Sequence, residues 1–114
     1  MPEGEVNWPG VAEKCREALG ALADEVRETC DLGAPPGLSD AGFKALLQQM
    51  FPPGEVRETF GTWLEGTWNH AESLSRSPAT TKKDAMRVYM WTCLSIGEFA
   101  EMARTYRESL AGRG

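Results

Sequence analysis

The chain of 114 residues is poor in the residues that build chemical sites. It has one histidine, His70, and three widely spaced cysteines. An odd number of distant cysteines makes neither a disulfide framework nor a Cys-x-x-Cys motif. A single histidine cannot supply the two Glu-x-x-His motifs of a di-iron bundle. Phosphate-loop, dinucleotide-binding and nucleophile-elbow motifs are also missing. We therefore expect no enzyme, with no catalytic residue, metal or cofactor.

Long apolar runs and a basic stripe are missing as well. No apolar run reaches the ~18 residues that span a bilayer, and the N-terminus lacks the pattern of a secretory signal. The net charge is −5, with 13 acidic and 5 basic residues in positions 1–72 against 4 and 7 in positions 73–114. The basic residues of the second part are mixed with glutamates, which is a poor match to a phosphate-binding stripe. These features predict a cytoplasmic protein that neither spans a membrane nor binds nucleic acid.

Apolar residues recur at helical spacing in four segments. The predicted helices cover residues 8–30, 40–50, 55–73 and 81–110. Asn7 and Ser39 are suitable N-caps, and Thr81 with Asp84 resembles a capping box. Leu38 and Phe43 have the spacing of a hydrophobic staple, and Gly33 is a plausible stop for the first helix. The short connections favour antiparallel neighbours. We predict an all-α, compact four-helix bundle in which three helices surround a long, mostly buried C-terminal helix.

The bundle is expected to form one domain over residues 1–114, with short flexible ends at 1–6 and 111–114. Its last helix is apolar around most of its circumference, whereas a surface helix needs only one apolar stripe. One side carries Met86, Tyr89, Met90, Cys93, Gly97 and Ala100, and the opposite side carries Val88, Trp91, Phe99, Met102 and Tyr106. We expect the first side to pack against the other helices. On the second side, internal packing and partner binding compete, because large exposed apolar patches mark interaction surfaces.

The remaining aromatic and polar candidates receive structural interpretations. Trp63 is expected in the core, whereas Trp8, Trp68 and Trp91 lie at the edges of the apolar stripes, where tryptophan often serves as an interface anchor. His70 is expected at the core boundary, hydrogen-bonded to its neighbours. The acidic residues of the first helix, including Glu13, Glu17, Glu25 and Glu28, indicate a solvated helix face.

The leading hypothesis is a non-enzymatic helical protein–protein interaction module, such as an adaptor, inhibitor or assembly factor. It would self-associate through the C-terminal helix as a homodimer or dock another protein there. The predicted partner-binding residues are Trp91, Phe99, Met102 and Tyr106, together with Trp68. Two alternatives stay open. One is a carrier of a small apolar ligand or lipid with a pocket inside the bundle. The other is an acidic, immunity-type inhibitor of a basic partner.

Overall fold

The computed structural model describes residues 6–32 and 40–112 of the chain. Within them it has four helices and no strand, which confirms the predicted all-α bundle. The helices are α1 (Trp8–Thr29), α2 (Asp40–Met50), α3 (Glu55–Ser75) and α4 (Lys82–Ala111). The helix bounds agree with the predictions to within two residues. The predicted roles of Gly33, Leu38 and Ser39 fall outside the described residues, as do most of the two chain ends.

Side chains cap two helices as their sequences predict. The Oδ1 atom of Asn7 accepts a hydrogen bond of 3.0 Å from the Gly10 N–H at the start of α1. At the start of α4, the Asp84 N–H donates to the Thr81 hydroxyl, and the Thr81 N–H donates to the Asp84 carboxylate, both at 3.2 Å. This capping box satisfies two backbone donors that a helix N-terminus would otherwise leave without partners.

Removal of the cap side chain gives a first prediction. Thr81→Ala should lower the free energy of unfolding by about 1 kcal/mol, because the Asp84 N–H loses its acceptor. Thermal unfolding followed by circular dichroism should show a midpoint lower by roughly 3–5 °C. The matched control is Thr105→Ala, since the Thr105 hydroxyl donates to the Glu101 carbonyl within α4 and caps no helix end. An unchanged midpoint for Thr81→Ala would contradict the prediction.

The same capping box has a pH dependence of defined sign. The hydrogen bond from the Thr81 backbone, together with that of its side chain, holds the pKa of Asp84 below its ordinary value of 3.8. A carboxylate whose pKa is lowered in the folded state stabilises the fold above its unfolded-state pKa, and this contribution is lost as the pH falls through the folded-state pKa. Asp84→Asn should therefore differ most from the unsubstituted chain above about pH 4 and converge with it in stronger acid.

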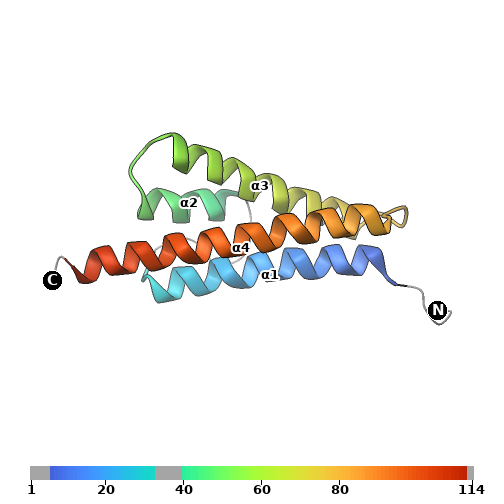
Figure 1. The fold of residues 1–114 in the computed structure, drawn as a ribbon, viewed down its shortest axis with the longest axis horizontal. Helices are drawn as coiled ribbons and strands as arrows, with labels where there is room; N and C mark the ends of the chain where they lie inside the picture. Colours follow the sequence, from blue (N-terminus) through green and yellow to red (C-terminus); the bar gives the residue numbers. More distant parts are fainter. Residues whose placement is uncertain (1–5, 33–39, 113–114) are drawn as a thin grey trace.

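Three of the helices form the length of the bundle, and the short α2 covers part of it. Helices α1 and α4 lie side by side and run in the same direction, whereas α3 runs the opposite way (Figure 1). Helix α1 packs against both α3 and α4, and α2 packs mainly against α3. The molecule is elongated, with principal extents of 58 × 25 × 22 Å. The predicted antiparallel arrangement of neighbouring helices therefore holds for α3 and α4, whereas α1 and α4 are parallel.

The core has two parts that follow from this arrangement. The larger part lies where α2 joins the other helices, and its aromatic centre is Phe43, Phe60 and Phe99, with ring centroids 6.5 Å apart for Phe43–Phe99 and 6.1 Å apart for Phe60–Phe99. The smaller part lies between α1, α3 and α4 alone and is built from Ala12, Cys15, Ala71 and Val88. Small side chains suit this end, because three helices without a fourth enclose less space.

The predicted orientation of α4 is wrong. The buried side chains of this helix are Ala85, Val88, Thr92, Ser95, Phe99 and Ala103, and the side with Met86, Tyr89 and Met90 is exposed. Two hydroxyl groups explain the difference. Thr92 donates to the Val88 carbonyl and Ser95 to the Trp91 carbonyl, each at 2.7 Å. Such local bonds remove the cost of burying a hydroxyl, so a face that hydropathy scores as interrupted forms the core contact.

Helix α4 continues through Gly97 without a break. Among the described residues, no helix combines the length and hydropathy needed to cross a bilayer.

Candidate functional site

The most distinctive surface feature is one side of α4, which we call the outer face. It consists of Met86, Tyr89, Met90, Cys93, Leu94, Gly97 and Ala100, all of them exposed. Met90 and Leu94 are 61% and 64% exposed. Eight large apolar side chains are exposed in residues 6–32 and 40–112, and four of them lie within residues 86–94. Single exposed apolar residues are normal, whereas large contiguous apolar patches often occur at interaction surfaces, which makes this cluster a candidate.

The spacing of the outer face has a further regularity. Met86, Met90, Cys93, Gly97 and Ala100 follow one another at alternating intervals of four and three residues. This is the spacing by which one helix presents a continuous seam to a second helix in a coiled coil. None of these five side chains is buried by the chain itself, so the seam has no helical partner within the described part of the molecule.

The polar groups near the outer face are consistent with an apolar seam. The Cys93 thiol beside the Tyr89 hydroxyl holds the pKa of Tyr89 above its ordinary value of 10.0, so this side chain is neutral at physiological pH. Arg104 donates to Glu101 and, at 2.7 Å, to Glu108. These hydrogen bonds and the charge of Arg104 hold the pKa of Glu101 below its ordinary value. Charged pairs therefore lie beyond the C-terminal end of the seam, while its centre carries no charge.

A groove between α3 and α4 borders the outer face. A hollow of about 510 Å³ is lined by apolar side chains that include Val56, Phe60, Trp63, Leu94 and Met102. A second hollow of about 480 Å³ continues from Trp63 to His70 and Trp91. Both open to solvent along the surface. These two hollows are therefore surface grooves and not the internal pocket that a carrier function predicts.

Aromatic rings form the floor of this groove. The indole N–H of Trp63 donates to the Ser95 hydroxyl at 2.6 Å, which links α3 to α4. The Trp63 and Trp91 rings meet edge to face with centroids 5.6 Å apart, and the His70 ring lies 5.4 Å from that of Trp91. These contacts hold the two helices together and leave one edge of the cluster exposed.

The five predicted partner-binding residues divide into two groups. Phe99 is fully buried, and Trp68 is also buried, with its ring 6.0 Å from that of Phe43. Neither side chain is accessible to a partner on the folded chain. Trp91, Met102 and Tyr106 are half-buried. Trp91 and Met102 line the α3–α4 groove, and Tyr106 packs on the core near Met50. The structure therefore does not bring these five residues together as one surface.

The assignments of the tryptophans on α3 are reversed. Trp63, predicted in the core, is 37% exposed, whereas Trp68, predicted at an edge, is 5% exposed. The buried face of α3 includes Gly61 and Thr67, which hydropathy does not select. A Cβ atom at Gly61 would lie 3.5 Å from Leu47 Cδ1, which is an ordinary van der Waals contact, so this face of α3 packs against α2. The buried face of α3 therefore lies away from Val56 and Trp63, and both are exposed.

His70 is half-buried, as expected, but its predicted hydrogen bonding differs. Its Nε2 atom is buried without a hydrogen-bond partner among the described residues, and its ring contacts Trp91. In residues 6–32 and 40–112, no group of three His, Cys, Asp or Glu side chains is placed to hold a metal ion. Cys15 and Cys30 are buried and Cys93 is exposed. Burial raises the pKa of the Cys15 and Cys30 thiols above their ordinary value of 9.0.

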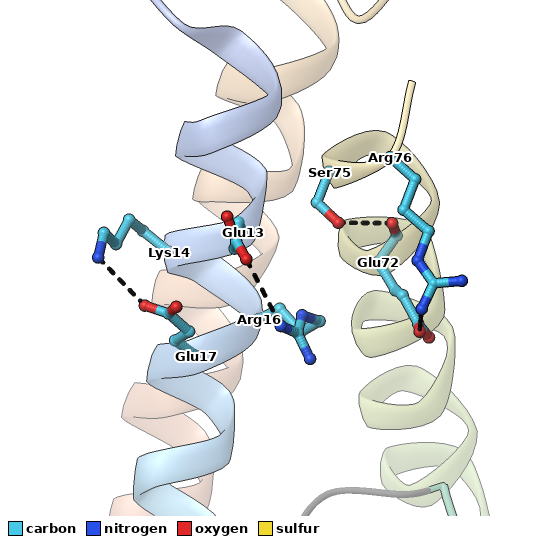
Figure 2. Close-up of polar contacts among 7 residues, drawn as sticks. All are labelled: Glu13, Lys14, Arg16, Glu17, Glu72, Ser75 and Arg76. Carbon is cyan, nitrogen blue, oxygen red and sulfur yellow. Dashed lines mark hydrogen bonds and ion pairs between the residues drawn. The ribbon is translucent and has the colours of Figure 1, made fainter. Parts of the chain in front are cut away.

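Three acidic residues of α1, Glu13, Glu17 and Asp24, pair with basic residues on the same helix. Figure 2 shows Lys14 directed toward Glu17 and Arg16 toward Glu13, with N–O distances of 3.3 and 3.8 Å. On α3 the Arg76 guanidinium lies 2.8 Å from Glu72 (Figure 2). Exposed pairs of this kind contribute little to stability. They agree with the interpretation of this side of α1 as a solvated face.

Comparisons with protein-family models, with curated proteins and with solved structures find no match to this chain. The functional inference therefore rests on the geometry of the chain itself.

The sequence groups Met86, Met90 and Gly97 on one side of α4, and that side was predicted to pack in the core, whereas the structure leaves it exposed. The alternating four- and three-residue spacing of the seam was available in the sequence. The information that it lacked was which side the other helices cover. That choice depends on how closely α1 and α3 can approach Thr92 and Ser95, and hydropathy does not report it.

Proposed function

We propose that this chain is a non-enzymatic helical protein–protein interaction module that self-associates through the outer face of α4. The observation that carries the proposal is the concentration of exposed Met86, Tyr89, Met90 and Leu94 within residues 86–94. Leaving these side chains in water costs free energy that a partner surface would recover, at about 25 cal/mol per Å² of apolar area buried. A second copy is the simplest partner, because most oligomers of soluble proteins are two-fold homomers.

Two further observations support this class of function. The seam residues have the spacing of a helix that pairs with another helix. The ring of His70, the only histidine, packs against the ring of Trp91, a contact typical of a structural role. The proposal keeps the C-terminal helix as the docking element and moves the docking surface from the Phe99 side to the Met90 side.

Met90→Asp tests this function. Each copy in the dimer would bury a carboxylate without a partner, at a cost of about 3 kcal/mol or more, which corresponds to a dimer at least ~100-fold weaker. Sedimentation velocity between about 1 and 500 µM, a range that brackets typical weak homodimers, should show concentration-dependent association for the unsubstituted chain and a monomer for the variant. The thermal midpoint of the monomer should stay unchanged, because Met90 is exposed.

The matched control is Val56→Asp. Val56 is also an exposed apolar residue, but it lies on α3 outside the outer face, so this variant should associate like the unsubstituted chain. Two results would overturn the proposal. One is a chain that stays monomeric at every concentration, and the other is an equal loss of association for both variants.

A further inference from the structure

The outer face of α4 has a gradient of side-chain size along the helix. Its N-terminal half carries the large Met86 and Met90, and its C-terminal half carries Gly97 and Ala100. A Cβ atom at Gly97 would meet nothing within 4 Å, so the surface there is open. In a parallel helix pair, the large residues would oppose each other and the small residues would leave a void. An antiparallel pair places each large residue against a small one, which fills the interface to normal packing density.

The charge of α4 also changes along the helix, from net positive in its N-terminal half to net negative in its C-terminal half. The N-terminal half of α4 carries Lys82, Lys83, Asp84 and Arg87, with a net charge of +2. The C-terminal half of α4 carries Glu98, Glu101, Arg104, Arg107 and Glu108, with a net charge of −1. A parallel pair would bring like charges together at both ends. An antiparallel pair places the basic half of each copy beside the acidic half of the other, which favours association in that orientation.

From these two independent gradients we infer that the outer face docks a second copy of the chain in the antiparallel sense, with Met90 of each copy over Gly97 of the other. This inference rests on the proposed function and specifies its partner and geometry. The seam positions 86, 90, 93, 97 and 100 map onto one another to within one residue when the helix is reversed about Cys93. Met86 then faces Ala100, Met90 faces Gly97, and the two copies of Cys93 meet near the two-fold axis.

The same register also determines which charged residues beside the seam face each other in the two copies. An antiparallel pair brings equivalent flanks of the two helices together. Arg87 of one copy therefore lies beside Glu101 of the other, offset by less than one helical turn. Glu101 already accepts hydrogen bonds from Arg104, so Arg87 would extend an existing ion-pair network across the dimer. Cys93 lies at the centre of the interface as a small side chain.

Disulfide trapping tests the orientation. Two variants are made in a Cys93→Ser chain, Met90→Cys and Gly97→Cys, and one of them carries a tag that shifts its mass. Oxidation of the mixture should give the tagged–untagged disulfide at a yield at least about fivefold above that of either variant alone, since a disulfide needs Cβ atoms about 4 Å apart. In the inferred register, position 97 of one copy lies over position 90 of the other, so the two copies of position 97 are about 10.5 Å apart along the helix axis. Cys15 and Cys30 are buried and provide an internal background.

Each outcome separates this inference from the proposed function. A dimer in sedimentation whose disulfides join position 90 to 90 and 97 to 97 would overturn the antiparallel arrangement and leave self-association intact. A strict monomer would overturn both. Gly97→Leu supplies a second measurement. It should raise the thermal midpoint of the monomer by a few degrees, because leucine is the better helix former, and weaken the dimer at least ~10-fold, because the space for Met90 is filled. A dimer of unchanged or greater affinity would contradict the register.

Discussion

Phe99→Ala should lower the free energy of unfolding by about 3–5 kcal/mol, which is one of the two largest effects expected of a single substitution in this chain. Phe99 is fully buried on α4, and its ring contacts those of Phe43 on α2 and Phe60 on α3. Truncation would remove the contact that joins these three helices and leave a cavity, because the surrounding backbone relaxes only in part. Domains of this kind are stable by only about 5–15 kcal/mol in total.

Urea unfolding followed by circular dichroism measures this effect. The midpoint should fall while the slope of free energy against urea stays the same, which indicates a change in stability and not in the compactness of the unfolded chain. Leu94→Ala is the matched control, since Leu94 lies on the same helix and is exposed. At a concentration at which the chain is monomeric, it should change the free energy of unfolding by no more than about 0.5 kcal/mol. Equal losses for the two variants would show that α4 is not oriented as described.

The comparison of Phe99 with Leu94 also shows which features of the fold could not be predicted from the sequence. The positions of the helices could be predicted, because apolar spacing, caps and the Pro52-Pro53-Gly54 break are local features. The orientation of α4 could not, because both of its sides are apolar and hydropathy ranks Met90 and Leu94 as highly as Val88 and Phe99. The structure places on the inside the side that carries the two hydroxyl residues, Thr92 and Ser95, each with its own carbonyl acceptor.

For the same reason, the sequence does not determine which side of α4 carries the candidate site. The sequence predicts correctly that α4 is apolar on more than one side. The described chain covers the side that the sequence assigns to a partner, and leaves exposed the side that the sequence assigns to the core. The exposed side is also the one with matched gradients of size and charge. These properties become informative only after the fold shows that no helix of the described chain covers them.

Trp68→Ala is the second substitution with a large expected effect, again about 3–5 kcal/mol of unfolding free energy. Trp68 is buried on α3, its ring meets Phe43 edge to face, and the Arg16 guanidinium of α1 lies 5.3 Å from the ring centroid. The substitution would remove a large apolar surface, an aromatic pair and a cation–π contact at one position. These contacts link α3 to both α1 and α2, so the loss should lower the unfolding midpoint of the whole bundle.

Trp63→Ala is the control that makes this test decisive, because it removes the same side chain from the same helix. Trp63 is partly exposed, and its specific contacts are the hydrogen bond to the Ser95 hydroxyl and the edge-to-face contact with Trp91. After its removal, Ser95 still donates to the Trp91 carbonyl, so no buried hydroxyl is left without a partner. We expect a loss of about 1–2 kcal/mol. The ratio of the two effects measures which face of α3 packs in the core. If Trp63→Ala were the more damaging variant, the stripe predicted from hydropathy would be correct, and the exposed edge of the α3–α4 groove would have to be reassigned to the core.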